Sequence, residues 1–184
     1  MTEVTAPEAG RRVLVLGGAR SGKSEFAESL LAGHAAVTYV ATSTADGADP
    51  DWERRIAAHR GRRPAGWRTV EGPDLAATLA DAQGAVLVDS LTAWLTGVLD
   101  QVRAWDRPAG TPAPVTDSVE RLMTAWRATR ATAVAVSDEV GLGVVPATPA
   151  GRLFRDELGA LNQRMAATAD AVWFVVAGVP MRLR

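Results

Sequence analysis

The sequence predicts an α/β fold in three layers, built on a mostly parallel sheet. Short apolar runs alternate with amphipathic segments along the chain, which is the pattern of strand–helix–strand units with right-handed crossovers. A glycine-rich loop joins the first apolar run to the first helical segment, as in nucleotide-binding α/β proteins. A last short segment after Pro180 predicts one antiparallel strand at the C-terminal edge of the sheet.

The expected strands are short runs in which apolar and β-branched residues predominate, and glycine, proline or polar residues bound them. Strands alternating with helices favour parallel pairing, so the carboxyl ends of these strands should lie along one edge of the sheet. In chain order the strands are expected over residues 13–16, 36–41, 67–71, 85–89, 132–137 and 171–177, with the antiparallel strand over 181–184.

The expected helices share apolar residues at helical spacing, such as Phe26, Leu30 and Leu31 in the first of them. Pro64 would end the second helix, and the proline-rich residues 103–114 are expected to form the one long loop. In chain order the helices are expected over residues 25–32, 51–61, 73–81, 90–102, 115–130 and 151–168.

The glycine-rich loop carries the most specific motif of the chain. Gly17, Gly22, Lys23 and Ser24 fill every fixed position of G-x-x-x-x-G-K-S/T, between a predicted strand and a predicted helix. This context predicts a phosphate-binding P-loop and therefore a P-loop NTPase-like fold, the alternative being a glycine-rich turn that only connects the two elements. The expected nucleotide-binding residues of the loop are Gly17, Gly18, Ala19, Arg20, Ser21, Gly22, Lys23 and Ser24.

Each part of this loop has a chemical task. Backbone N–H groups and the positive end of the helix dipole can hold a polyphosphate. Lys23, the only lysine among 20 basic residues, is expected to reach the β- and γ-phosphates, and the Ser24 hydroxyl is expected to hold Mg²⁺.

The composition narrows the class of protein further. A net charge of −1 and a pI near 6.1 give no reason to expect a nucleic-acid partner. The absence of cysteine excludes disulfides and fits a cytoplasmic protein. No apolar run approaches the roughly 18 residues that cross a bilayer, so no stable membrane insertion is expected. Residues 1–11 are expected to be a frayed tail, and residues 12–184 a single nucleotide-binding domain.

Two further places are candidate sites. Asp89 closes the fourth predicted strand, where an aspartate can support magnesium in P-loop proteins or can simply cap the next helix. His59 is followed at once by an arginine-rich stretch, which indicates an anion site. The alternatives are a half-buried histidine on a packing face and a solvated basic helix end. The arginine-rich stretch consists of Arg60, Gly61, Arg62 and Arg63.

Several motifs together resemble a known family. GGARSGKS, YVATS, RIAAHRGRRPAGWRTVE, VLVDSLTAWLT, DEVGLGVVP and GRLFRDELGALNQRMAATADAVWFVVAG follow one another between residues 13 and 184. In this order they resemble the bifunctional adenosylcobinamide kinase and adenosylcobinamide-phosphate guanylyltransferase family. The P-loop alone is shared by many NTPases, whereas the segment around His59 and the loop before Pro146 are far more specific.

The resemblance implies an enzyme of cobalamin biosynthesis that acts on a corrinoid substrate. It implies phosphorylation of adenosylcobinamide by ATP or GTP, followed by transfer of GMP from GTP to the product. That transfer runs through a GMP-histidine intermediate and gives adenosylcobinamide-GDP and pyrophosphate. The matching histidine is His59, and the implied assembly is a homo-oligomer, most often a trimer. By matching position, the implied nucleotide contacts beyond the P-loop are Ala41, Thr42, Ser43, Arg60, Gly61, Arg62, Arg63, Glu71 and Asp89.

This chain departs from the family's pattern at two positions. Asp138 stands where the family usually has asparagine before Glu-Val-Gly. Gly97 stands where an asparagine commonly follows the tryptophan-containing helix. Asp138 adds a charge near the expected phosphate or corrinoid side of the site. Two other functions therefore stay open from the sequence: a P-loop small-molecule kinase without guanylyl transfer, and a nucleotide-binding module without turnover.

Overall fold

The computed structural model describes residues 10–42, 66–72, 74–106 and 112–184. These residues form a seven-stranded sheet in the order β3-β2-β4-β5-β1-β6-β7. Neighbouring strands are parallel except for the antiparallel pair β6 and β7 at the C-terminal edge. The strands are β1 (Arg12–Gly17), β2 (Val37–Ala41), β3 (Trp67–Glu71), β4 (Ala85–Asp89), β5 (Thr132–Asp138), β6 (Ala171–Val176) and β7 (Val179–Arg182).

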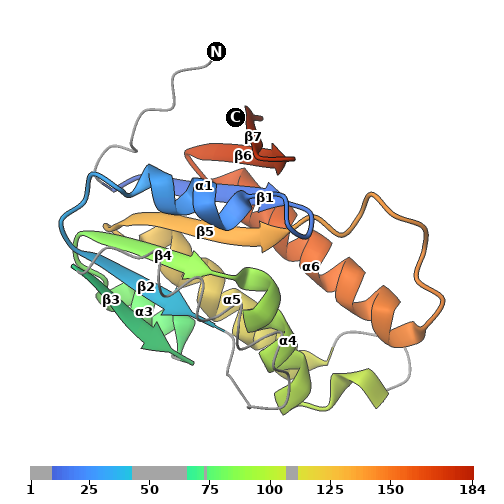
Figure 1. The fold of residues 1–184 in the computed structure, drawn as a ribbon. Helices are drawn as coiled ribbons and strands as arrows, with labels where there is room; N and C mark the ends of the chain where they lie inside the picture. Colours follow the sequence, from blue (N-terminus) through green and yellow to red (C-terminus); the bar gives the residue numbers. More distant parts are fainter. Residues whose placement is uncertain (1–9, 43–65, 73, 107–111) are drawn as a thin grey trace.

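Helices cover both faces of the sheet, so the predicted three-layer α/β fold is confirmed (Figure 1). One face packs against α1, and the other packs against α3, α4, α5 and α6. The described helices are α1 (Lys23–Leu30), α3 (Leu75–Asp81), α4 (Leu91–Gln101), α5 (Ala113–Ala128) and α6 (Pro149–Thr168), with a 3₁₀ turn η1 (Ala104–Asp106). The helix expected over residues 51–61 lies outside the described residues.

The alternation of side chains along β1 explains why both faces are apolar. Val13 and Val15 pack with α1, whereas Leu14 and Leu16 pack with the helices on the other face. All four side chains are buried, as the central position of β1 between β5 and β6 requires. The P-loop therefore starts from a strand that is fixed on both faces and along both edges.

Most element boundaries differ from the predictions by one or two residues, and two of these differences have clear local reasons. The antiparallel strand begins at Val179 rather than Met181, because Ala177 and Gly178 both have positive φ and form a two-residue hairpin turn. The last helix begins at Pro149 rather than Gly151, since the Thr148 side chain accepts a hydrogen bond from the Gly151 N–H and caps it there.

The loop predicted over residues 103–114 also proves shorter. Residues 104–106 form η1, and α5 already begins at Ala113, after Pro112. Within the described ranges, no helix combines the length and apolarity that crossing a bilayer takes.

An ion pair ties the start of β1 to the start of β6. The Asp170 carboxylate accepts hydrogen bonds from the Arg12 backbone N–H at 2.8 Å and from the Arg12 guanidinium at 3.3 Å. Partial burial raises the pKa of Asp170, but the side-chain and backbone hydrogen bonds from Arg12 and its charge lower that pKa more. The pKa of Asp170 in the folded protein therefore lies below its ordinary value.

Asp170→Asn is expected to lower the free energy of unfolding by about 1 kcal/mol at pH 7, since a charged acceptor is lost. A folded-state pKa below the unfolded one stabilises the protein above the unfolded pKa, and this contribution disappears as the pH falls through the folded pKa. Urea unfolding at pH 7 and in acid measures the effect. A difference from the parent protein that does not shrink in acid would contradict the assignment, and the exposed Asp117→Asn on α5 is the control.

Candidate functional site

The loop after β1 has the backbone geometry of an anion cradle. Gly17 has no room for a side chain, because a Cβ atom there would lie 2.5 Å from Ser21 Oγ and 2.7 Å from the Val175 carbonyl oxygen. Gly22 has a φ of 91°, in the left-handed region, and occupies the N-cap position of α1 without a side-chain hydrogen bond. The first N–H groups of α1 are thus not bound by a capping side chain and can receive an anion.

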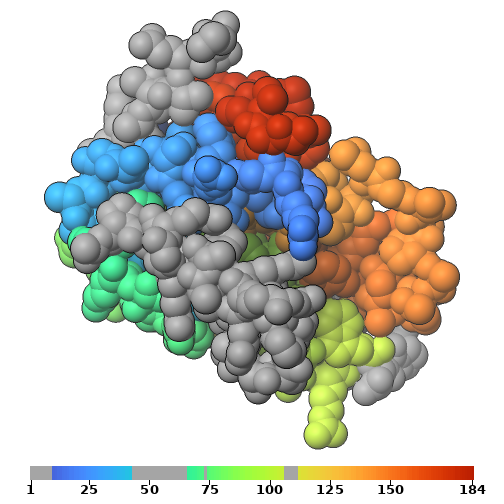
Figure 2. Space-filling model, viewed as in Figure 1, coloured from blue at the N-terminus to red at the C-terminus, as the bar shows by residue number. Residues whose placement is uncertain are grey.

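Neighbouring strands hold this loop in place. The Glu139 N–H donates to the Gly17 carbonyl at 3.1 Å, and the Gly178 N–H donates to the Ser21 carbonyl at 2.8 Å. The tip of the loop, Ala19 and Arg20, is exposed. Figure 2 shows the blue loop at the surface beside the orange segment that follows β5. The cradle is therefore rigid at its base and open to solvent at its tip.

The Lys23 ammonium is paired with an aspartate at the end of β5. Lys23 Nζ lies 2.7 Å from Asp138 Oδ1 and donates a second hydrogen bond to the Gly18 carbonyl at 3.2 Å. The Lys23 side chain is 13% exposed and the Asp138 side chain 27%, so the pair is partly shielded from water. The sequence indicated a charge at Asp138 near the site, but it did not indicate this partner.

The backbone of Asp138 is held from two helices. Its N–H donates to Thr92 Oγ1 of α4 at 2.9 Å, and its carbonyl accepts from Asn162 Nδ2 of α6 at 3.0 Å. Asn162 itself is buried. Because both backbone groups are hydrogen-bonded, we expect the Asp138 carboxylate to move by rotation of its side chain and not by movement of the backbone.

Asp89 lies at the end of β4 and contacts the first turn of α1. Ser24 Oγ donates to Asp89 Oδ1 at 3.4 Å, and the Tyr39 hydroxyl donates to Asp89 Oδ2 at 2.6 Å. The alternative that Asp89 caps the next helix is wrong, because Ser90 caps α4 by accepting a hydrogen bond from the Ala93 N–H.

Ser24 and Asp89 together fit a magnesium ion. They offer one hydroxyl and one carboxylate, which are the oxygen ligands that Mg²⁺ prefers. The described part of the chain has no cluster of three histidine, cysteine or acidic residues that could hold a metal. A site with so few protein ligands suits Mg²⁺, since this ion usually keeps several waters and takes its remaining ligands from substrate phosphates.

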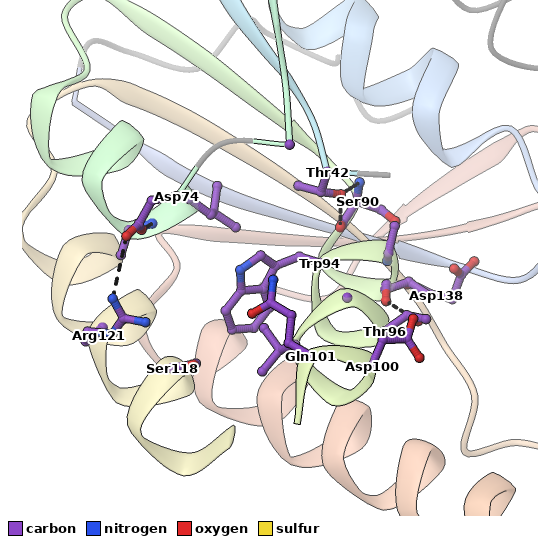
Figure 3. Close-up of a pocket in the computed structure, with 17 residues that line it drawn as sticks. Thr42, Asp74, Ser90, Trp94, Thr96, Asp100, Gln101, Ser118, Arg121 and Asp138 are labelled. Atoms are coloured by element: carbon purple, nitrogen blue, oxygen red, sulfur yellow. Dashed lines mark hydrogen bonds and ion pairs between the residues drawn. The ribbon is translucent and has the colours of Figure 1, made fainter. Parts of the chain in front are cut away.

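A pocket of about 950 Å³ opens beside this group (Figure 3). It runs past the carboxyl ends of β2, β4 and β5 and along one side of α4. At its inner end, the Thr42 hydroxyl donates to the Ser90 carbonyl at 2.6 Å and accepts from the Ser90 N–H at 2.9 Å. Its lining includes Thr42, Ser90, Thr92, Trp94, Gly97 and Asp138.

The structure brings some predicted residues together and leaves others apart. Lys23, Ser24 and Asp89 lie around the P-loop, and Ala41 and Thr42 lie at the end of β2. Glu71 is exposed at the end of β3, four strand positions from β1, which corresponds to about 19 Å at the usual strand spacing. The predicted residues that lie outside the described ranges are Ser43, His59, Arg60, Gly61, Arg62 and Arg63.

Three residues at this site were missed by sequence reasoning: Tyr39, Thr92 and Asn162. Tyr39 lies in a strand of apolar and β-branched residues, so its hydroxyl contact with Asp89 gives no signal in the pattern. Thr92 and Asn162 lie on helices that meet β5 only in the folded chain. Asp138, by contrast, was indicated by the sequence, because it directly follows a predicted strand.

Comparison with solved structures supports the fold. An ATPase of a bacterial type III secretion system superimposes with a TM-score of 0.59 at 14% identity, covering 90% of this chain and 51% of that one. The type III secretion ATPase EscN of enteropathogenic E. coli gives a TM-score of 0.54 at 17% identity, covering 91% of this chain and 43% of EscN. This chain thus spans about half the length of these ATPases, and at such identity the likeness shows the α/β fold alone.

Sequence comparison covers nearly the whole chain. Bifunctional adenosylcobalamin biosynthesis protein CobP of Pseudomonas aeruginosa is 45% identical over 178 residues, which are 94% of this chain and 97% of CobP. The corresponding CobU proteins of Salmonella typhimurium and Escherichia coli are 38% and 36% identical over 182 residues, covering 94% of this chain and 99% of each protein. The model of one family matches residues 13–183. The chain belongs to the cobinamide kinase / cobinamide phosphate guanyltransferase family.

Proposed function

We propose that this chain carries out both reactions of its family at one nucleotide site. It phosphorylates adenosylcobinamide with ATP or GTP, and it then transfers GMP from GTP to adenosylcobinamide phosphate through a GMP-histidine intermediate on His59. The observation that carries the proposal is the P-loop of residues 17–24, which presents Lys23 and the Ser24–Asp89 contact at one end of the sheet. The full-length match to the family supports the choice of substrates.

In this proposal the P-loop binds the nucleotide tail. The uncapped N–H groups at the start of α1 hold the phosphate oxygens, and Lys23 leaves Asp138 to contact the β- and γ-phosphates. Ser24 and Asp89 would hold Mg²⁺, which would supply electrostatic stabilisation of the phosphate charge when bound. The acceptor hydroxyl oxygen forms a bond to the γ-phosphorus while the bond from that phosphorus to the β–γ bridging oxygen breaks, so the nucleoside diphosphate leaves and the hydroxyl proton is released to solvent.

The second reaction divides one difficult substitution into two easier ones. A nitrogen of the His59 imidazole attacks the α-phosphorus of GTP, and pyrophosphate leaves. A phosphate oxygen of adenosylcobinamide phosphate then attacks the same phosphorus, and the histidine nitrogen leaves. The arginines at positions 60, 62 and 63 would offset the negative charge that develops on these phosphates.

Incubation with GTP labelled at the α-phosphate tests the covalent step. We expect an acid-labile, alkali-stable label on the parent protein and no label on His59→Ala, because the nucleophile is gone. His34→Ala is the matched control, since His34 is the only other histidine, and it should be labelled like the parent.

Other results of this experiment would identify a different function. Phosphorylation of the corrinoid without any label on the protein would leave a kinase alone. Nucleotide binding with neither transfer would leave a nucleotide-binding module. A label that persists in His59→Ala would contradict the choice of nucleophile.

We also propose that the protein is a cytoplasmic homo-oligomer and that this oligomer is a trimer, as the family resemblance implies. Exposed apolar side chains along the hairpin of β6 and β7 support association between copies, because edge strands of this kind are normally covered. These side chains are Val176, Val179, Met181 and Leu183. Light scattering should give a particle well above 19.3 kDa, and a particle of that mass would contradict the proposal.

A further inference from the structure

The pocket beside α4 adjoins the P-loop through one residue. Asp138 is part of the pocket lining, and its carboxylate is also the partner of Lys23 Nζ. Thr42 and Ser90 continue the lining across the ends of β2 and β4, where ligands bind in open parallel sheets. Figure 3 shows Asp138 and Thr42 at the end of the pocket nearest these strands, while Arg121 and Asp74 lie at the far end.

The charges of the described lining residues do not favour a second nucleotide as the occupant of this pocket. Arg121 is the only cation among its described lining residues, and it lies 3.5 Å from Asp74. Asp100 adds negative charge, and Asp138 adds more once Lys23 leaves it, so the described lining is more acidic than basic. It therefore offers a polyphosphate little attraction and suits a neutral or cationic molecule better.

The uncharged lining residues indicate what kind of molecule fits. Hydroxyl and amide groups line the walls, and Trp94 and Leu75 provide apolar surface. This mixture suits an alcohol that carries hydrogen-bonding groups on an apolar framework. The volume of about 950 Å³ lies at the upper end of the range for small-molecule pockets, so the molecule can be large.

We infer that this pocket binds the acceptor alcohol, and that Asp138 couples acceptor binding to nucleotide binding. The inference rests on the proposed function and deepens it. Without nucleotide, the Asp138 carboxylate forms an ion pair with Lys23. When the phosphates draw Lys23 away, the Asp138 carboxylate becomes available to accept a hydrogen bond from the acceptor hydroxyl. The nucleotide therefore prepares the acceptor site, and by linkage the acceptor strengthens nucleotide binding by the same factor.

Gly97 offers a direct test of the pocket. It lies on α4 in the lining, and a Cβ built there meets no atom within 4 Å, so a side chain at this position would extend into open space. Gly97→Leu should weaken binding of adenosylcobinamide about tenfold or more, with an unchanged affinity for a non-hydrolysable GTP analogue. Gly97→Ala should show a smaller loss of the same kind.

Gly159→Leu is the matched control for Gly97→Leu. Gly159 lies on α6 outside the pocket, is exposed, and has no atom within 4 Å of a built Cβ. The Gly159→Leu variant should bind acceptor and nucleotide with the same affinities as the parent protein. An unchanged acceptor affinity in Gly97→Leu would overturn the pocket assignment, because that variant places a bulky side chain in the pocket without touching the P-loop.

Asp138→Asn tests the coupling. In the parent protein, a saturating GTP analogue with Mg²⁺ should raise acceptor affinity at least about fivefold, as in other coupled pairs of sites. In Asp138→Asn, Lys23 no longer faces a carboxylate, so nucleotide affinity should rise about fivefold or more. The coupling factor, which is the ratio of acceptor affinities with and without nucleotide, should fall toward one. Calorimetric titration of each ligand with and without the other measures both quantities.

Three results separate this inference from the proposed function. Equal coupling factors in the parent and Asp138→Asn would overturn the role of Asp138. A coupling factor of one in the parent protein would also overturn the role of Asp138. A parent protein that binds nucleotide but neither binds nor phosphorylates adenosylcobinamide would overturn the proposed function itself, and the acceptor assignment with it.

Discussion

Lys23→Ala is expected to lower phosphorylation of adenosylcobinamide by about 10²- to 10³-fold, the usual cost of removing one preorganised charge from a transition state. The same variant should lose formation of the GMP-enzyme, because one P-loop is proposed to serve both nucleotides. Lys23 is the only lysine of the chain, so no other lysine side chain can take its place. Steady-state kinase assays and labelling with α-phosphate-labelled GTP measure the two losses.

Thermal unfolding serves as the control for Lys23→Ala. The substitution leaves the Asp138 carboxylate without its lysine partner, so a modest loss of stability is expected, but the Asp138 backbone keeps its bonds to Thr92 and Asn162. A variant that stays folded and still forms the GMP-enzyme at the parent rate would show that the two reactions use separate nucleotide sites.

Gly17→Ala is expected to lower the free energy of unfolding by about 2 kcal/mol, which corresponds to a fall in Tm of about 4–8 °C for a chain of this size. The added methyl group would lie 2.7 Å from the Val175 carbonyl oxygen, which is backbone and cannot move aside as a side chain can. Relief requires β1 and β6 to separate where the P-loop begins, so nucleotide affinity should fall as well. Differential scanning calorimetry and nucleotide titration measure both effects.

The adjacent glycine provides the control for Gly17→Ala. A Cβ at Gly18 meets nothing within 4 Å, and the φ of Gly18 lies outside the positive range. Gly18→Ala should therefore keep the parent Tm within about 2 °C. A Tm for Gly17→Ala equal to that of Gly18→Ala would contradict the close packing of the loop against β6.

Local patterns predicted the elements well because each one depends on nearby residues. The strands over residues 67–71 and 85–89 match β3 and β4 at both ends, since segments rich in apolar or β-branched residues end there at Glu71 and Asp89. The boundaries that moved depend on caps and turns. Thr148 starts α6 early, and the pair Ala177 and Gly178 turns the chain into β7 before Pro180.

Local patterns do not give the order of the strands in the sheet. That order determines which residues come together at the site. β5 lies between β1 and β4, which places Asp138 beside Lys23, although 114 residues separate the two in the sequence. The same order carries Glu71 away from the P-loop on the edge strand β3. Motif and spacing could therefore indicate the loop and Asp89, but not the pairing of Lys23 or the contacts of Tyr39 and Asn162.

The solitary lysine has a practical consequence for chemistry done on this protein. Reagents that acylate or reductively alkylate amines can modify one side chain only, apart from the N-terminal amine, and that side chain is 13% exposed and held by a carboxylate. Amine coupling to a sensor surface through this side chain would attach the protein by its own nucleotide loop. The chain's 19 arginines do not react with such reagents, so a single mass increment on Lys23 would report directly on whether that loop is occupied.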